Sequence, residues 1–195
     1  MTNTQSDISS EKLAYAAQHG DHNALNSLIK RHKNEAYRVA LRMCGRPFDA
    51  EEILQLALER LFKHLRRYDH TRAFKPWLFR IVANQARSFL RKQYIKSLFF
   101  LSEPPAAPEP INDNSPHLSL HKDEVKQVLK DALLALPIDQ REAFIFKHIE
   151  GLSFAQMQQA TGASVAALRV RTHRARKAIL QYLQDRHVTF SALRE

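Results

Sequence analysis

Apolar residues recur at intervals of three and four along most of this chain. In residues 25–43 and again in residues 53–65, they have the spacing that lines one face of an α-helix. No convincing stretch alternates apolar and polar residues with β-branched enrichment, which is the pattern of a half-buried strand. We therefore predict an all-α fold. The 195 residues, 44% of them hydrophobic, are enough to bury one core or two small ones.

The helical pattern stops in the segment SEPPAAPEPINDNSPHLS, residues 102–119, which contains five of the eight prolines. Proline removes a backbone donor and clashes with the preceding turn, so this segment cannot sustain a helix. It predicts an acidic, proline-rich linker at residues 97–121. Two small helical domains are then expected, at residues 10–96 and 122–186.

Positive charge is concentrated in the two predicted domains. The formal net charge is +10, and residues 97–121 carry three acids and no Lys or Arg. Two basic bodies around an acidic spacer favour two contacts along one polyanion, with a membrane surface as the alternative. The sequence has no apolar run of membrane-spanning length, and its polar start, MTNTQSDISSEK, is unlike a signal peptide. We expect a cytoplasmic protein with no membrane insertion.

Few residues in the sequence suggest catalysis, a disulfide or a metal site. Cys44 is the single cysteine, which excludes an internal disulfide and a zinc site of several cysteines. The ten histidines include His19, His22 and His32 near acidic residues, which leaves a metal site as an alternative. No HExxH, P-loop or glycine-rich phosphate motif is present. The expectation is a protein that is not an enzyme, with no catalytic residue, metal or cofactor.

Capping residues predict where the helices of the first domain begin and end. Serine and aspartate begin helices, glycine ends them, and proline suits the first turn. The expected boundaries are a short helix from Ser10 to Gly20, a longer one up to Gly45, a third from Asp49 with Glu52 at capping-box spacing, and a fourth from Pro76 to about Gln93.

The segment LSFAQMQQATGASVAALRVRTHRARKAI, residues 152–179, has the pattern of a helix-turn-helix. Ser153 and Gln156 have capping-box spacing, Gly162 suits a tight turn, and Ser164 can cap the second helix. That helix carries cations on one side and an apolar stripe on the other, which would dock it on its domain. A basic second helix is typical of one that enters the DNA major groove, although a structural helix pair with a solvated face is the alternative.

The motifs together resemble a known family. Residues 49–92, DAEEILQLALERLFKHLRRYDHTRAFKPWLFRIVANQARSFLRK, resemble the second domain of bacterial sigma-70 family sigma factors. Residues 135–179, ALPIDQREAFIFKHIEGLSFAQMQQATGASVAALRVRTHRARKAI, resemble their fourth domain. Their order and short join resemble the extracytoplasmic-function (ECF, group 4) sigma factors, which keep only these two domains.

The resemblance implies a transcription initiation factor with a sigma-2-like bundle and a sigma-4-like helix-turn-helix. Its expected partners are core RNA polymerase, through the beta and beta-prime subunits, promoter DNA and an anti-sigma factor. The first domain would bind melted minus-10 DNA and the second would bind duplex minus-35 DNA. A free-standing helix-turn-helix repressor is the alternative, although it leaves the motifs of the first domain without a purpose.

The resemblance also assigns site residues. Core polymerase contacts are implied at an acidic patch, comprising Asp49, Glu51, Glu52 and Gln55. Helix capping alone would account for Asp49 and Glu52 but not for Glu51. Leu56 stands where relatives often carry another acid.

Minus-10 contacts are implied on the fourth helix and in the loop before it. The loop contributes Tyr68 and Phe74. The helix contributes a minus-10 stripe, comprising Trp77, Arg80, Asn84, Arg87 and Arg91. An aromatic ring can stack on bases, arginines can neutralise the backbone and an amide can bond an unpaired base edge, so this stripe suits a separated DNA strand. Trp77 is also a candidate for the core. Ser88 stands where many relatives have Asp.

Minus-35 contacts are implied on the basic helix. Base or groove contacts are expected from Arg169, Val170, His173 and Arg174, and phosphate contacts from Arg171 and Arg176. The alternative for His173 is a side chain that is only exposed to solvent and contacts no DNA. Ala167 replaces a Thr that is usual in the family, which removes one hydroxyl contact.

Overall fold

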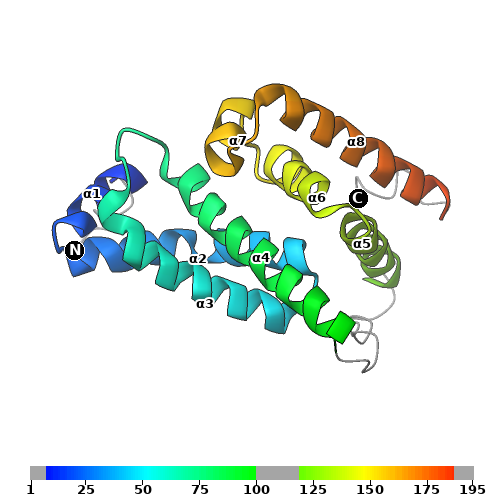
Figure 1. Ribbon diagram of the computed structural model, residues 1–195, viewed down its shortest axis with the longest axis horizontal. Coiled ribbons are helices and arrows are strands. Elements are labelled where there is room, and N and C mark those ends of the chain that lie inside the picture. Colours follow the sequence, from blue (N-terminus) through cyan, green and yellow to red (C-terminus); the bar gives the residue numbers. More distant parts are fainter. Residues whose placement is uncertain (1–7, 100–118, 187–195) are drawn as a thin grey trace.

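The computed structural model describes residues 8–99 and 119–186, and all regular elements in these ranges are helical (Figure 1). The first group of elements is α1 (Ser10–Gln18), α2 (His22–Cys44), α3 (Pro47–His64), the short 3-10 helix η1 (Leu65–Arg67) and α4 (Phe74–Phe99). The second group is α5 (Ser119–Leu134), α6 (Ile138–Phe144), the π-helical turn η2 (Ile145–Ile149), α7 (Phe154–Thr161) and α8 (Val165–Gln184). The predicted all-α fold is confirmed.

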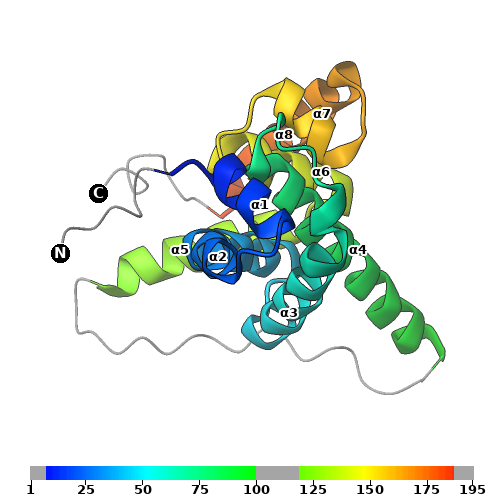
Figure 2. The ribbon, with the colours of Figure 1, turned by 90° about the vertical axis from the view of Figure 1, so that its left-hand side faces the viewer.

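Helices α4 and α5 both extend into the range predicted as the linker, 97–121. Most of the proline-rich segment lies outside the described residues. Figure 2 shows the last turns of α4 and the first turns of α5 extending away from the body on opposite sides. The described part of the chain contains no helix long and apolar enough to span a bilayer.

Three helix starts differ from the prediction by two residues or fewer. Ser9 caps α1 in place of Ser10, whose hydroxyl lies 2.7 Å from Nε2 of His32. Helix α3 begins at Pro47, since proline suits the first helical position, so Asp49 lies inside the first turn. Helix α4 begins at Phe74, whose N–H donates to the Glu11 carboxylate at 3.0 Å.

Two glycine predictions hold because their backbone requires a left-handed conformation. Gly45 ends α2 with φ of 82°, and its N–H donates to the Leu41 carbonyl at 2.7 Å. Gly162 ends α7 with φ of 76°. Residues with a Cβ rarely adopt such angles, so these turns fix where the helices end.

The two domains each bury an apolar face and then pack on one another. In the first domain α2, α3 and α4 pack together, and in the second α8 packs on α5, α6 and α7. Between the domains, α4 contacts α7, while α2 contacts α5 and α6. Phe79 of the first domain stacks on Phe146 of the second, with ring centroids 5.7 Å apart. Both rings are buried, so one apolar core runs across the domain contact.

Candidate nucleic-acid interface

Helices α7 and α8 form the predicted helix-turn-helix. The Ser153 side chain accepts from the Gln156 N–H at 3.2 Å, and the Gln156 side chain accepts from the Ser153 N–H at 2.9 Å. This is the predicted capping box. The Ser164 side chain caps α8, also as predicted. The helix start that would approach DNA is therefore fixed by its own sequence.

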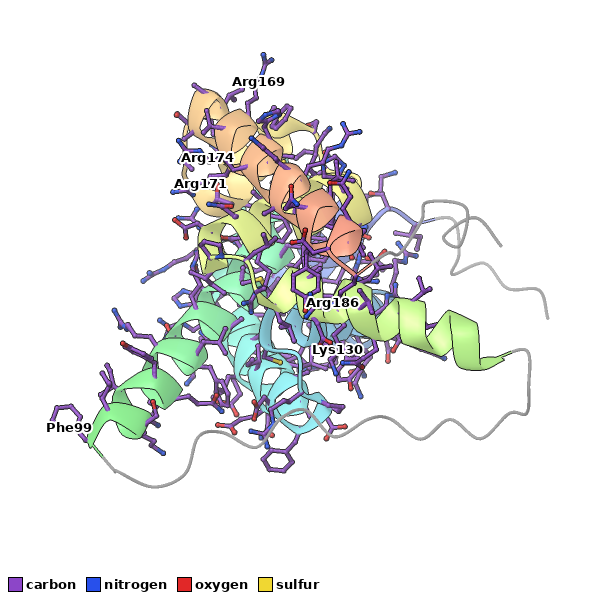
Figure 3. The ribbon with its side chains drawn as sticks, turned by 90° about the vertical axis from the view of Figure 1, so that its right-hand side faces the viewer. Phe99, Lys130, Arg169, Arg171, Arg174 and Arg186 are labelled. Carbon is purple, nitrogen blue, oxygen red and sulfur yellow. The ribbon has the colours of Figure 1, made fainter. Side chains whose placement is uncertain are left out.

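Helix α8 has a buried side and an exposed side. The buried residues recur at three and four positions and are Leu168, Thr172, Ala175, Ile179 and Leu183. The exposed residues include Arg169, Val170, His173, Arg174, Arg176 and Lys177. Figure 3 labels Arg169, Arg171 and Arg174 in the half of α8 that follows the turn. The predicted DNA-facing side is thus accessible apart from Arg171, which is half-buried.

Two arginines of α8 are held by neighbours. The Arg171 guanidinium lies 3.0 Å from the Asp139 carboxylate of α6. The Arg169 guanidinium lies 5.5 Å from the centroid of the Phe154 ring of α7, a cation-π distance. Arg169 is therefore oriented without losing its charge, whereas a phosphate must compete with Asp139 for Arg171.

A cationic groove of about 390 Å³ lies where α3 and η1 meet α4. We call it the minus-10 groove, after the contact that the family resemblance implies for its α4 residues. Its lining residues are Arg60, His64, Arg67, Trp77, Arg80, Ile81, Asn84, Gln85 and Ser88. Three arginines, two amides and an indole ring on one concave surface match what a single strand requires.

One wall of this groove lies outside the site residues that the family resemblance assigns. Arg60, His64 and Arg67 lie four and three residues apart, so helical geometry places them on one side. That spacing indicates a basic stripe that the sequence shows. The apolar face of the same helix explains its helical pattern without this stripe, so the pattern alone does not assign the stripe a role.

Tyr68 and Phe74 lie in the core, at 4% and 1% exposure, where DNA cannot reach them. Their rings and that of Trp77 cluster, with centroids between 4.8 and 5.6 Å apart. The Tyr68 hydroxyl donates to the Arg72 carbonyl, and burial raises the pKa of that phenol. Their expected role as direct contacts is therefore corrected to support of the loop and of Trp77. Trp77 is half-buried, so it has both a packing side and an open side.

The domain contact engages one residue of the minus-10 stripe and leaves others exposed. Arg80, Asn84 and Arg91 are exposed. Arg87 donates to the Asn84 side-chain oxygen and to the Glu142 carboxylate of the second domain. One arginine of the stripe is therefore already paired with an internal anion.

The residues of the acidic patch also differ in exposure. Glu51, Glu52 and Gln55 are exposed on α3, whereas Asp49 is buried. The Asp49 carboxylate accepts from Nε2 of Gln93 at 3.3 Å. Asp49 thus joins α3 to α4 and is buried, whereas the rest of the predicted acidic patch is exposed.

Two surface grooves flank the exposed side of α3. The groove with α2 has a volume of about 550 Å³ and is lined by Lys33, Asn34, Tyr37, Glu51, Leu54, Gln55, Leu58, Glu59 and Phe62. The groove with α4 has a volume of about 320 Å³ and is lined by Phe48, Asp49, Glu52, Leu56, Gln85, Ser88, Phe89, Lys92, Gln93 and Lys96. Exposed Phe48 and Phe62 beside carboxylates are typical of a protein-binding surface.

Nothing in the described residues resembles a redox or metal centre. Cys44 is half-buried, and burial raises the pKa of its thiol to about 11, which keeps it protonated and unreactive. Across residues 8–99 and 119–186, no three His, Cys, Asp or Glu side chains gather as a metal site would require.

Comparison with known families matches both domains. The family model described as sigma-70 region 2 matches residues 28–94, which contain α3 and most of α2 and α4. The description sigma-70 region 4 matches residues 126–179, which contain the helix-turn-helix. A free-standing repressor does not account for the first match.

Individual relatives match along most of the chain. The RNA polymerase sigma factor CarQ of Myxococcus xanthus is 32% identical, over 85% of this chain and 92% of its own length. The ECF RNA polymerase sigma factor SigW of Bacillus subtilis is 27% identical, over 85% of this chain and 92% of its own length.

Solved structures share the fold. CnrH, in complex with the cytosolic domain of CnrY, superimposes with a TM-score of 0.67 at 26% identity, covering 91% of this chain and 99% of CnrH. RpoE from Bartonella quintana, in complex with the anti-sigma factor NepR, has a TM-score of 0.67 at 23% identity, covering 82% of this chain and 96% of RpoE. Both regions and their order agree with the surfaces described above, so the chain belongs to the sigma-70 family, as an ECF RNA polymerase sigma factor.

Proposed function

We propose that this chain binds core RNA polymerase through α3 and directs it to promoters whose minus-35 element is read by α8 and whose melted minus-10 strand enters the minus-10 groove. The observation that carries the proposal is the presence of two separate cationic surfaces, one concave and one a helix-turn-helix, in a chain of this family. The polymerase supplies the chemistry of RNA synthesis, and the chain acts in the cytoplasm, where polymerase and promoters are found.

The chemistry of the two surfaces supports different DNA forms. A helix of α8's diameter fits the major groove of a duplex, and guanidinium groups pair with guanine there. The minus-10 groove instead offers the Trp77 ring and the Asn84 amide, which suit unpaired bases.

The proposed polymerase contact is the pair of grooves beside α3. Glu51 and Gln55 line one groove, and Glu52 lines the other with Leu56. Apolar anchors next to carboxylates favour a basic, helical partner surface, and Leu56 adds apolar area where an acid is usual.

An anti-sigma partner is proposed for the groove between the domains. This groove has a volume of about 540 Å³ and is lined by Leu41, Arg42, Lys126, Leu129, Lys130, Leu133, Leu134, Phe144, His148, Ile149 and Ile179. An apolar floor with cationic edges suits an amphipathic helix that carries acids. The support from relatives is that RpoE and CnrH are each seen in complex with another protein.

The polymerase contact is tested by charge reversal. Glu51→Lys combined with Glu52→Lys should abolish co-purification with core polymerase, because both side chains are exposed and lie beside apolar anchors. Single reversals should weaken it, and Asp185→Lys, an exposed acid on the other domain, serves as the single-charge control. Full polymerase binding by a helical double variant contradicts the assignment.

A further inference from the structure

The first helix, α1, lies outside residues 28–94, which the sigma-70 region 2 model matches. Leu13 and Ala14 are its buried residues, and it packs chiefly on α2. It also contacts η1 and α4, and Figure 1 shows it beside the segment that joins those two elements. These contacts are additional to the packing on α2 that holds α1 in the first domain.

The Gln18 side chain holds the start of that segment. Its Nε2 donates to the Leu65 carbonyl at 2.9 Å and to the Tyr68 carbonyl at 2.6 Å. Leu65 begins η1 and Tyr68 follows its last residue, so one amide bridges both ends of the 3-10 turn. Gln18 is half-buried, and a partly buried carbonyl that loses its donor costs more free energy than an exposed one.

Two other residues on the same side of α1 hold the rest of the segment. The Glu11 carboxylate accepts from the N–H of Phe74, the first residue of α4, at 3.0 Å, where it also suits the helix dipole. The Tyr15 ring lies edge-on to the His70 ring, with centroids 4.9 Å apart. Residues 11, 15 and 18 are four and three apart, so helical geometry places them on one face. We call Glu11, Tyr15 and Gln18 the α1 clamp.

The segment between the clamped ends is a preformed turn. Oδ1 of Asp69 accepts from the Thr71 N–H at 3.0 Å, and the Asp69 carbonyl accepts from the Arg72 N–H at 3.0 Å. The Arg72 guanidinium lies 3.1 Å from the Asp69 carboxylate. These three side chains are exposed, so the tip of the turn has no core of its own. It therefore moves as a unit, and its position depends on how its ends are held.

The two ends of this segment are also part of the two walls of the minus-10 groove. Arg67, in η1, lines one wall, and Trp77, in the first turn of α4, lines the other. Gln18 bonds the residue that follows Arg67, and Glu11 bonds the residue three positions before Trp77. One short helix is therefore bonded to both walls. A binding surface discriminates best when a supporting shell fixes its geometry.

We propose that the α1 clamp sets the width of the minus-10 groove and the orientation of the exposed turn beside it, and so helps to decide which minus-10 bases the separated strand can carry. Glu11, Tyr15 and Gln18 are positioning residues, which act through residues 65–74 and need no contact with DNA. The proposal rests on the proposed function for the identity of the bound strand. The clamp itself is a property of the free chain and can be measured without polymerase or DNA.

The first measurement is amide hydrogen exchange over residues 65–74 in the full free chain. Gln18→Glu keeps the side-chain shape but replaces the donor with a carboxylate that faces two carbonyl oxygens. It should speed exchange in this segment by about fivefold or more, as expected from the loss of two hydrogen bonds. Tyr15→Ala should speed it too. It covers the case in which Gln18→Glu disturbs folding, because Tyr15 is 47% exposed and its removal leaves no core cavity.

Gln140→Glu is the matched control. Gln140 is a half-buried glutamine of α6 in the second domain, so the variant makes the same substitution and the same change of charge away from the clamp. It should leave the exchange of residues 65–74 at the wild-type rate.

The second measurement separates positioning from a general loss of stability. Holoenzyme carrying each variant is assayed for open complexes on promoters with single-base changes in the minus-10 or in the minus-35 element. The clamp variants should lose preference among the minus-10 changes and keep the wild-type preference among the minus-35 changes, because α8 belongs to the other domain. A destabilised chain would instead lose activity on all promoters by the same factor.

Unchanged exchange in both folded clamp variants overturns the proposal, whatever the promoters show, and so does equal acceleration by Gln140→Glu. Faster exchange together with wild-type minus-10 preference overturns the role of the clamp in base selection. Absence of promoter selection by the unaltered holoenzyme contradicts the proposed function instead, and the exchange result still decides whether the clamp exists.

Discussion

At the residue scale, burial decides which polar side chains are available to a partner. Asp49, Tyr68 and Phe74 belong to motifs typical of binding, yet each is buried and stabilises the first domain. Sequence spacing cannot separate these roles, because a motif residue and a core residue can have the same position on a helix. Glu51 and Asn84 remain exposed, so their proposed roles can be tested by single changes.

His32 gives the first domain a dependence on pH. It is buried between the Ser10 hydroxyl and the Glu35 carboxylate, and burial lowers its pKa from the ordinary 6.5. The folded state therefore binds fewer protons at this site than the unfolded chain, so stability falls as pH drops below 6.5 toward the lowered pKa. His32→Gln should flatten the fall in Tm between neutral pH and pH of about 5. Thermal unfolding at several pH values tests this, and identical slopes for both proteins would refute it.

Asn84 is expected to act on DNA only after strand separation. Asn84→Ala removes an exposed amide from the minus-10 groove, so it should reduce open-complex formation on duplex promoters more than on templates already mismatched across the minus-10 element. Permanganate reactivity of unpaired thymines measures the open complex. Equal losses on both templates would assign Asn84 a structural role, such as its bond with Arg87.

At the element scale, most helix ends could be predicted from the sequence, because they are set by residues that are neighbours in the sequence. Gly45, Gly162, Ser153 and Ser164 terminate or cap helices through their own backbone angles and side chains, as predicted. The start of α4 at Phe74 involves Glu11, 63 residues away, whereas the local sequence predicts a start at Pro76. The same limit applies to the minus-10 groove, whose two walls come from different helices.

The two sides of α8 predict different consequences for its arginines. Arg169 is exposed and oriented by Phe154, so Arg169→Ala should cost about 1–3 kcal/mol on the preferred minus-35 element and relax selectivity at one base position. Arg171→Ala should weaken binding to all minus-35 sequences alike and reduce the salt dependence of binding by about one phosphate contact. Holoenzyme transcription from single-base minus-35 variants at two salt concentrations measures both effects. A uniform loss for Arg169→Ala with reordered preferences for Arg171→Ala would reverse the assignment.

At the scale of the whole molecule, the domain contact could not be predicted from the sequence. Arg87 and Glu142 are 55 residues apart, on either side of the proline-rich segment, and each fits its own helix without the other. Helical periodicity reports only that a face is apolar and does not identify the surface that covers it. The family resemblance predicts two domains and their partners, whereas the contact between the domains, apolar and ionic, is visible only in the three-dimensional structure.

The central claim is that this chain gives promoter selectivity to a polymerase. The most direct measurement is transcription in vitro from fragmented genomic DNA by core RNA polymerase, with and without the chain, followed by mapping of RNA 5′ ends. The account predicts transcripts that depend on both proteins and start downstream of two shared motifs, with little binding of the chain alone to the same duplex fragments. Tight binding of those fragments without polymerase, together with no new transcripts when polymerase is present, would contradict it.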